Sequence, residues 1–287
     1  MWTSLQYPDD RSNEGKPVSG NYPGSIPEKV TTLHCPGVDI HASQRGERPD
    51  AVFLHGFSGS LQVWDPLWDE LDGDVIALRY DLRDFGASRA HDEREFSHSE
   101  DLLAVLDNCA PGPVDLVGVS MGGAVALNFA LDHPQRVRRL VLISPAITGW
   151  EWSDDWRALW RPIIEQARAG NMDRARQLWW QHPLFETTRS SNAGPALRAS
   201  IDRFAGRQWL ADHQLPDHPD LDRVHGLAVP TLLLTGERDF SDFLRIADLL
   251  AGAAPDLRRL TFPAAGHLLQ MEQPRAVAGE LRAFWSG

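Results

Sequence analysis

Short apolar runs alternate with longer stretches of helical periodicity over most of the chain. The apolar runs lie at residues 51–54, 75–80, 114–117 and 140–143, and helices are expected near 61–71, 102–106 and 121–131. The runs VDLVGV and RLVLIS are apolar on both faces, as strands of a parallel sheet are when helices cover both sides. This part of the chain therefore predicts an α/β fold with a doubly wound, mostly parallel sheet.

The same alternation continues on either side of this region. Strands are expected at 29–34, at 38–43, in VPTLLLTG and at 257–262, and helices at 243–250 and 274–285. The first two strands alternate apolar and polar residues around a Pro-Gly turn, which is typical of a hairpin at a sheet edge. With these additions the predicted sheet has eight strands and helices on both faces.

Two segments depart from the pattern. Residues 1–26 are rich in Pro, Gly, Asp, Asn and Ser and are expected to form a flexible N-terminal arm. Between residues 148 and 226 the strand pattern disappears, and helical stretches contain Trp150, Trp152, Trp156, Trp160, Trp179, Trp180 and Trp209. We interpret residues 148–226, the inserted segment, as a helical cap on a core domain formed by 27–147 and 227–287.

Composition and charge narrow the class of partner. The 287 residues include 28 basic and 40 acidic side chains, a formal net charge of −12, which disfavours binding to nucleic acid or to an anionic membrane surface. Cys35 and Cys109 are too few for a disulfide framework, and no signal peptide or long apolar span is found. We expect a cytoplasmic protein that acts on a small molecule, and a homodimer is left open.

The motif with the clearest chemical meaning is GVSMGG at residues 118–123. It follows the strand VDLV and precedes a helix, which is the setting of a nucleophile elbow. Small residues are needed there because the turn is tight and a side chain at Gly118 or Gly122 would collide with neighbouring chain. Ser120 would then project above the sheet at a helix N-terminus, as a nucleophile must. A glycine-rich helix cap is the simpler alternative.

A second turn, HGFSG at residues 55–59, also ends a strand. The backbone amides of Phe57 and Met121 could together donate to the oxyanion of a tetrahedral intermediate. His55 is expected to stabilise this turn rather than to carry a proton.

A carboxylate and a histidine follow in the order that the elbow motif predicts. Asp239 ends the strand of TLLLTGERD, and His267 follows the strand RLTF, so both are expected at carboxyl ends of strands. His267 would accept the proton of Ser120, and Asp239 would orient the imidazole. Glu237 and Asp242 are alternatives for the acid.

HGFSGS, YDLRDFGAS, GVSMGG, GERD and AGH occur in this order in the chain. In these motifs the sequence, from about residue 28 onward, resembles the α/β-hydrolase superfamily, and in particular its serine esterase and enol-lactonase-like branch. The resemblance implies Ser120 as nucleophile, His267 as base, Asp239 as acid, and Phe57 and Met121 as oxyanion donors. VFLHGFSG and GERD also resemble the MenH-like synthases, which use such a triad for an elimination.

Other residues of interest lie in the inserted segment. Trp152, Trp156 and Trp160 recur every four residues and form an aromatic stripe, which packs in the core or lines a substrate pocket. Arg157 and Arg161 beside it are either solvated or face a substrate carboxylate. Asp84, in the YDLRDFGAS loop, is expected to hold that loop. No histidine pattern indicates a metal site, and neither a metal nor a cofactor is predicted.

These observations predict a serine hydrolase that cleaves a carboxylic ester or lactone of a small, largely apolar molecule through an acyl-enzyme. Three alternatives remain. One is a MenH-like lyase or C–C bond hydrolase that uses the same triad. Another is a ligand receptor that retains the fold, and the third is an aminopeptidase that holds an amine with Glu151, Asp154 and Asp155.

Overall fold

The computed structural model describes residues 26–215 and 218–287, so the predicted N-terminal arm, apart from its last residue, lies outside the described residues. Within this part of the chain nine strands form one sheet, with the order β1-β2-β4-β3-β6-β7-β8-β9 and β5 paired to β2. The strands are β1 (Glu28–Cys35), β2 (Val38–Arg45), β3 (Ala51–Leu54), β4 (Ala77–Tyr80), β5 (Arg89–Ala90), β6 (Val114–Val119), β7 (Val137–Ile143), β8 (Thr231–Gly236) and β9 (Leu257–Phe262).

The sheet is mostly parallel, as predicted. β3 pairs in parallel with β4 and β6, and β6 to β9 continue in parallel register. β1 and β2 form the expected antiparallel hairpin at one edge, and β2 also runs antiparallel to β4. Eight strands lie where the apolar runs predicted them, and the ninth, β5, is a two-residue strand without a hydrophobic pattern of its own.

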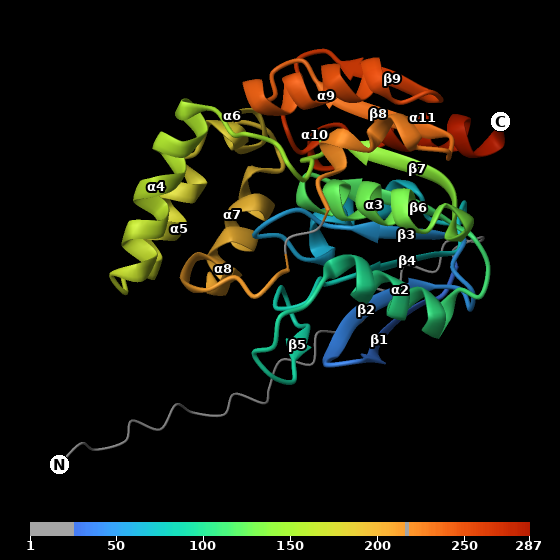
Figure 1. Cartoon of the computed structure of the whole chain (residues 1–287), viewed down its shortest axis with the longest axis horizontal. Coiled ribbons are helices and arrows are strands. Elements are labelled where there is room, and N and C mark those ends of the chain that lie inside the picture. The colour runs from blue at the N-terminus through green and yellow to red at the C-terminus, as the bar shows by residue number, and fades with distance from the viewer. Residues whose placement is uncertain (1–25, 216–217) are drawn as a thin grey trace.

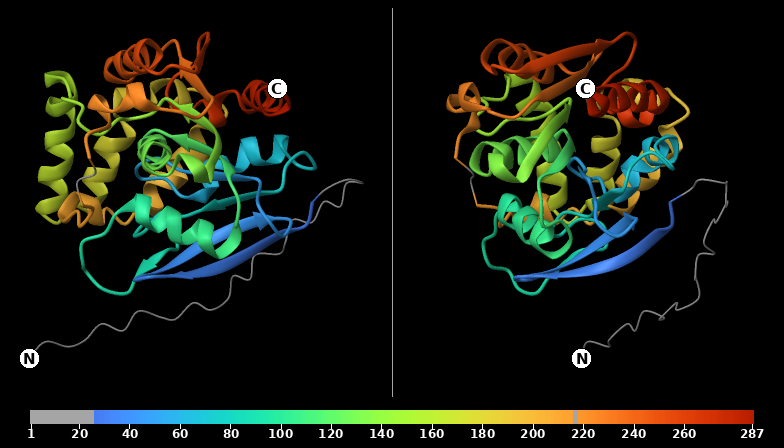
Figure 2. Two further views of the ribbon diagram at one scale, coloured as in Figure 1. Left: turned by 45° about the vertical axis from the view of Figure 1, so that its right-hand side comes forward. Right: turned by 90° about the vertical axis from the view of Figure 1, so that its right-hand side faces the viewer.

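Helices cover both faces of this sheet. They are α1 (Asp65–Glu70), α2 (His98–Cys109), α3 (Met121–Asp132), α9 (Ser241–Ala253), α10 (Leu269–Glu272) and α11 (Pro274–Ser286). Figure 2 shows α1 and α11 together on one face, with α2, α3 and α9 on the other. α3 is buried over almost its whole length, because it packs on β6 and β7 and also contacts α2.

The predicted helix at 61–71 is not continuous. A 3-10 turn over Leu61–Trp64 comes first, and α1 follows with Pro66 in its first turn. Proline has no amide hydrogen and its fixed φ suits the start of a helix, so the α-helix begins around Pro66 rather than at Leu61.

Between β7 and β8 the chain forms helices and no strand among its described residues. They are α4 (Asp154–Arg168), α5 (Met172–Trp180), α6 (Glu186–Arg189), α7 (Gly194–Arg203) and α8 (Arg207–Leu210), with 3-10 turns at Pro183–Phe185, Asp220–Asp222 and Val224–Gly226. α4 begins after Ser153, whose hydroxyl accepts from the amide of Trp156 at 3.2 Å. Figure 1 shows these helices beside the carboxyl ends of the parallel strands.

The hydrophobic core forms on both faces of the sheet, because the central strands carry apolar residues on both sides. β3, β6 and β8 are buried at every position, and their side chains meet those of the flanking helices. No helix of the described chain is long and apolar enough to cross a membrane.

Candidate active site

Ser120 lies at the turn between β6 and α3, in a strained backbone conformation. Its φ is 54° and its ψ is −117°. The turn is held by backbone hydrogen bonds: the Ser120 amide donates to the Ile143 carbonyl at 3.0 Å, and its carbonyl accepts from Ala124 and Ala146 at 3.1 and 3.0 Å. Such a conformation persists only where the surroundings impose it, which agrees with the tight turn predicted from GVSMGG.

The neighbouring glycines are required for steric reasons. A Cβ at Gly118 would lie 2.3 Å from the carbonyl oxygen of Gly122, and one at Gly122 would lie 2.3 Å from that of Leu54. Both separations are far below van der Waals contact, so the collisions expected from the sequence are present. α3 can therefore start close against β3 and carry Ser120 to the end of the sheet.

His267 and Asp239 come together from two successive loops. The Nδ1 atom of His267 lies 3.0 and 3.2 Å from the two carboxylate oxygens of Asp239, and both side chains are almost fully buried. Asp239 follows β8 and His267 follows β9, so the parallel strands deliver both groups to the same edge. The ring of Phe243 packs against the imidazole at a centroid distance of 4.3 Å and restricts its rotation.

The two alternative carboxylates are engaged elsewhere. Asp242 accepts hydrogen bonds from Ser153 and from the indole of Trp150 at 2.6 to 3.0 Å. Burial raises the pKa of Asp242, but these hydrogen bonds outweigh it and leave the pKa below its ordinary value. Glu237 accepts from the Ala264 amide at 3.2 Å. Asp242 thus fastens the inserted segment to α9, and of the three carboxylates Asp239 is the partner of His267.

The HGFSG turn lies against the elbow. A Cβ placed on Gly56 would be 3.1 Å from the Cβ of Ser120. Within the described residues, neither the amide of Phe57 nor that of Met121 donates a hydrogen bond to another group of the chain. Both amides are therefore free to donate to a bound oxyanion.

His55 stabilises this turn through contacts of both its ring nitrogens. Its Nδ1 lies 2.8 Å from the Gly56 carbonyl, and its Nε2 accepts from the Leu82 amide at 3.0 Å. An imidazole with both nitrogens occupied by backbone groups stabilises a turn and has no free atom for proton transfer. The turn-stabilising role expected for His55 is confirmed.

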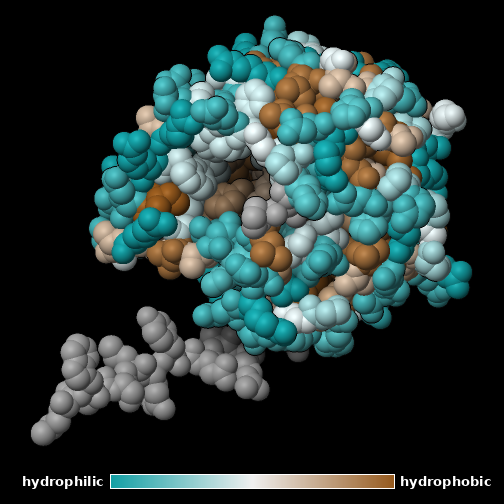
Figure 3. All heavy atoms as spheres, in the orientation of Figure 1, coloured by the Kyte–Doolittle hydropathy of each residue, from teal (hydrophilic) through white to brown (hydrophobic). Residues whose placement is uncertain are grey.

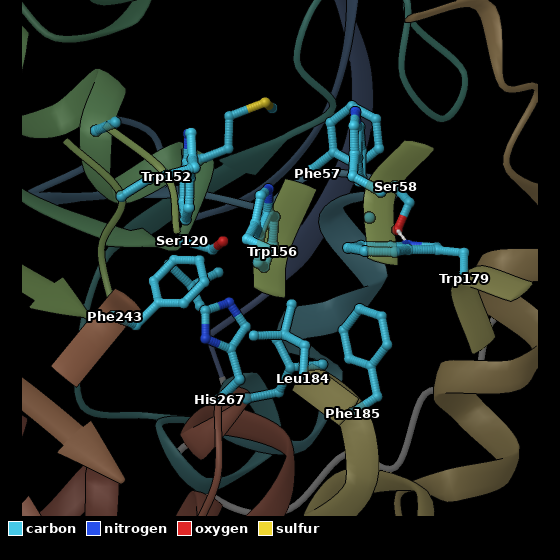
Figure 4. A pocket seen from close by; sticks show the side chains of 18 of the residues that line it. Phe57, Ser58, Ser120, Trp152, Trp156, Trp179, Leu184, Phe185, Phe243 and His267 are labelled. Atoms are coloured by element: carbon cyan, nitrogen blue, oxygen red, sulfur yellow. Dashed lines mark hydrogen bonds between the residues drawn. The ribbon is translucent and has the colours of Figure 1, made fainter. Parts of the chain in front are cut away.

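A cavity of about 650 Å³ opens above these groups. Ser120 and His267 line it together with Phe57, Met121 and residues of the inserted segment. Figure 4 shows the Ser120 hydroxyl and the His267 imidazole on the same side of the cavity. In the space-filling view of Figure 3, a hollow with apolar atoms in its wall lies between the inserted segment and the sheet domain.

The aromatic stripe forms one wall of this cavity, but only Trp156 and Trp160 lie on α4, because the helix begins after Ser153 and Trp152 precedes it. Trp152, Trp156 and Trp160 all line the cavity. Their rings are nearly parallel, with centroids 4.4 Å apart for Trp152 and Trp156 and 6.1 Å apart for Trp156 and Trp160. The sequence left open whether these tryptophans pack in the core or line a pocket, and in the structure they line the pocket.

Several lining residues carry no signal in the sequence. They come from α5, from the turn that follows it, from α7 and from α9, and they are Trp179, Leu184, Phe185, Leu197 and Phe243. They belong to short elements without a shared periodicity, so only the folded arrangement identifies them. The density of tryptophan in the inserted segment indicates an aromatic surface, but it does not tell that Trp179 lines the cavity and that Trp180 does not.

Charged groups are few in the wall. Among the described lining residues, the ionisable side chains are those of Glu151, Arg157 and His267. Arg157 is half exposed and pairs with Asp154 at 2.8 Å and Glu151 at 3.9 Å. Arg161 is exposed and does not line the cavity. The two arginines therefore do not converge on one ligand.

Asp84 and Cys109, which the sequence also singled out, take part in contacts within the fold. Asp84, with a left-handed φ of 64°, lies 3.4 Å from Arg207 of α8 and so links its loop to the inserted segment. The thiol of Cys109 donates to the Val105 carbonyl at 3.1 Å. In the described part of the chain, no group of three or more His, Cys, Asp or Glu side chains is arranged to hold a metal ion.

Known proteins share this sequence pattern and fold. Residues 52–274 match the family described as alpha/beta hydrolase fold. The chain is 28% identical over 247 residues to a pimeloyl-[acyl-carrier protein] methyl ester esterase of Nitrosomonas europaea, covering 79% of this chain and 92% of that protein. It is 30% identical over 262 residues to a 2-succinyl-6-hydroxy-2,4-cyclohexadiene-1-carboxylate synthase of Salmonella paratyphi C, covering 84% of this chain and 97% of that protein.

A solved structure agrees with the fold. The enol-lactonase from Burkholderia xenovorans superimposes with a TM-score of 0.74 at 21% identity, over 90% of this chain and all of that one. The match over 52–274, the relative at 30% identity and the shared architecture lead to one conclusion. The chain belongs to the α/β hydrolase family of enzymes.

Proposed function

We propose that the protein is a serine hydrolase that cleaves a carboxylic ester or lactone of a small, largely apolar molecule. The observation that carries this proposal is the position of Ser120 and His267 in one aromatic-walled cavity, with Asp239 behind the imidazole. A strained nucleophile turn, a base and an orienting carboxylate are the parts that acyl transfer requires.

In this mechanism His267 accepts the proton of the Ser120 hydroxyl through Nε2 as the serine attacks the substrate carbonyl. Asp239 accepts a hydrogen bond from Nδ1, which fixes the tautomer and stabilises the imidazolium that forms. The proton then passes to the leaving alkoxide, and the acyl group stays on Ser120. Phe243 packs against the ring and limits its rotation between the two transfers.

The amides of Phe57 and Met121 would stabilise the negative charge on the tetrahedral intermediate. Each such donor is typically worth about 3–4 kcal/mol of transition-state stabilisation. In the second half-reaction His267 activates water, which attacks the acyl-enzyme and releases the acid. Besides the chain and the substrate, only this water takes part in these steps.

The cavity wall indicates the class of substrate. Trp152, Trp156, Trp160, Trp179 and Phe185 offer large apolar surfaces, and they favour an acyl or ring group of similar character. Apart from His267, the ionisable residues among the described wall residues are Glu151 and Arg157, which pair with each other. The carboxylates of a substrate with several negative charges would therefore find no unpaired cation in this wall.

A chromogenic short-chain ester such as p-nitrophenyl butyrate tests the proposal. We expect turnover by the wild type and a loss of roughly 10³-fold or more in Ser120→Ala. Equal turnover by the wild type and by Ser120→Ala would contradict the proposed nucleophile.

The second candidate is a MenH-like lyase that uses the same residues. It is favoured by the synthase of Salmonella paratyphi C, which the chain matches at 30% identity over nearly all of that protein. This candidate predicts that purified enzyme shows no Ser120-dependent turnover of simple esters. The two reactions are separated by one assay series, since an elimination yields no free alcohol and needs no acyl-enzyme.

A further inference from the structure

We propose that Trp179 and Ser58 act as positioning residues that hold the oxyanion loop, residues 55–59, in its active conformation. Through them the inserted segment would determine where the Phe57 amide points. This inference rests on the proposed function, because it assigns a purpose to the Phe57 amide in the same site.

The link is one buried hydrogen bond between distant parts of the chain. The indole Nε1 of Trp179, on α5, donates to the Ser58 hydroxyl at 2.6 Å. Trp179 is 2% exposed and Ser58 is 4% exposed. Figure 4 shows this bond at the cavity wall, away from Ser120 and His267. A buried bond shielded from water is difficult to replace with solvent, so it constrains both partners.

Ser58 has a backbone conformation that needs such a constraint. Its φ is 58°, in the left-handed region that serine rarely adopts. A change in its torsions would turn the Ser58–Gly59 peptide, whose N–H donates to the Gly56 carbonyl at 3.1 Å. The Gly56 carbonyl and the Phe57 N–H belong to one planar peptide group, so this bond helps to orient the proposed amide donor. The Ser58 carbonyl also accepts a longer bond of 3.4 Å from Ser200 of α7. Two helices of the inserted segment therefore hold residue 58 by its side chain and its backbone.

The Phe57 side chain is bound by the same segment. Its ring lies 5.3 Å from that of Trp160, 6.0 Å from that of Trp179 and 5.3 Å from that of Phe204. The ring contacts are apolar and non-directional, so they fix the location of residue 57 but not the orientation of its amide. The orientation depends on directional hydrogen bonds, and the bond between Trp179 and Ser58 contributes by fixing the residue whose following amide, that of Gly59, donates to the Gly56 carbonyl.

The peptide group that carries the Phe57 amide is held through its carbonyl, that of Gly56, from two sides. This carbonyl lies 2.8 Å from the Nδ1 of His55 in the sheet domain and accepts from the Gly59 amide at 3.1 Å. The Gly59 amide belongs to the Ser58–Gly59 peptide, so the second bond depends on the torsions of Ser58 and, through them, on Trp179.

Two substitutions cut this bond from opposite partners. Ser58→Ala removes the acceptor and leaves the Trp179 ring in the cavity wall, and Trp179→Phe removes the donor. We expect each to lower kcat for p-nitrophenyl butyrate by roughly 10- to 100-fold, the range expected for a misplaced oxyanion donor, with KM changed less than about threefold. The double variant should lose no more than the stronger single variant, because both remove one interaction.

Trp209→Phe is the matched control. Trp209 is also buried and its ring lies 6.3 Å from that of Phe57, but its Nε1 has no hydrogen-bond partner within the described residues. This variant removes an indole N–H close to the Phe57 ring without removing a hydrogen bond. It should retain kcat within about threefold, because only packing volume changes.

Hydrogen exchange of the amides in residues 56–59 gives a readout independent of turnover. We expect roughly 5- to 10-fold faster exchange in Ser58→Ala and Trp179→Phe, corresponding to one lost hydrogen bond, and no change in Trp209→Phe. Wild-type exchange and wild-type kcat in Ser58→Ala would overturn the inference, as would additive losses in the double variant. If the wild type hydrolyses no ester, the proposed function fails, and the exchange rates alone decide whether Trp179 orders the loop.

Discussion

At Ser120 the backbone, rather than the side chain, determines where the hydroxyl proposed as nucleophile lies. A φ of 54° costs on the order of 1–3 kcal/mol at a non-glycine residue. Three backbone hydrogen bonds to β7 and α3 and the loop after β7 offset that cost, and the hydroxyl needs no cap interaction of its own. His267 differs, since its position depends on a carboxylate partner and on the ring of Phe243.

The role of Asp239 can be tested with an isosteric change. Asp239→Asn keeps the volume but offers Nδ1 an amide group, which favours the wrong imidazole tautomer. We expect kcat for p-nitrophenyl butyrate to fall roughly 10³- to 10⁴-fold with little change in KM. Glu237→Gln is the control, because the Glu237 carboxylate accepts from the Ala264 amide and does not contact His267 in the described part of the chain, and this variant should stay within a few-fold of wild type. Equal losses in both variants would contradict the assignment of the acid.

The steric requirement at Gly122 predicts a loss of stability. Gly122→Ala would place its Cβ 2.3 Å from the Leu54 carbonyl oxygen, so we expect the free energy of unfolding to fall by about 3 kcal/mol or more. Gly279→Ala is the matched control on α11, where a Cβ meets no atom within 4 Å. There the greater helix propensity of alanine should add about 0.5–1 kcal/mol. Urea denaturation measures both, and a stable Gly122→Ala protein would contradict the close contact of α3 and β3.

At the scale of elements, α4 combines two functions on one helix. Its exposed face carries acidic and basic residues in local pairs, such as Asp154 with Arg157. Its other face presents Trp156 and Trp160 to the cavity, at a spacing that the 3.6-residue period brings to one side. Trp152 precedes the helix and extends this wall by stacking on Trp156. The helix is tied to α9 through Ser153, whose hydroxyl and amide donate to Asp242. The aromatic wall is thereby held above His267.

The aromatic wall predicts a preference for longer apolar acyl groups. Burial of one methylene contributes at most about 0.8 kcal/mol, or roughly fourfold in kcat/KM. We expect kcat/KM to rise from p-nitrophenyl acetate to the hexanoate ester, and Trp156→Ala to reduce this rise by removing cavity wall. Trp180→Ala is the control, because Trp180 lies on α5 outside the cavity lining and contacts Arg189 and Arg198 instead. An unchanged chain-length profile in Trp156→Ala would exclude contact between Trp156 and the acyl group.

At the scale of the whole molecule, the fold buries several ionisable groups that do not take part in the proposed chemistry. His98 is 2% exposed at the start of α2, and its Nδ1 has no partner among the described residues. Burial, with electrostatic repulsion from the neighbouring His55 and Arg83, lowers the pKa of His98 to about 3. Burial and the neighbouring His267 and Arg189 likewise lower the pKa of His182 to about 4. The native state therefore keeps these imidazoles neutral.

This burial makes global stability depend on pH. Below about pH 6.5 each of these histidines binds a proton in the unfolded chain but not in the native state. The free energy of unfolding therefore decreases as the pH falls, and the contribution of His98 extends from about pH 6.5 to about pH 3. The slope is about 1.4 kcal/mol per pH unit for each such histidine.

The contribution of His98 can be isolated by substitution. Between pH 7 and 5, His98→Asn should lose about 2 kcal/mol less than wild type in urea unfolding, because one of the proton-binding differences is gone. His225→Gln, at an exposed position, should keep the wild-type pH dependence. A variant at residue 98 with the wild-type slope would show that the imidazole titrates normally in the native state.

Much of the fold and part of the site were predictable from local sequence. Apolar runs in β3, β6 and β8 predicted parallel strands because both faces of each strand are buried. GVSMGG predicted the elbow because glycine is the residue that such a close approach tolerates, and the order of Ser120, Asp239 and His267 followed the motif. The two-residue strand β5 and the break before α1 were missed, since short elements lack a detectable period.

The sequence by itself determined the α/β architecture, the strained turn at Ser120 and the strand ends that bear Asp239 and His267, because these depend on periodicity, glycine and chain order. Only the tertiary structure decided that Asp239 rather than Asp242 meets the imidazole, that the α4 tryptophans line the cavity, and that Trp179 reaches Ser58. These contacts join residues of different elements, some of them more than a hundred positions apart. Which side chains meet across such separations depends on how the helices of the inserted segment pack on the sheet, and no local pattern encodes it.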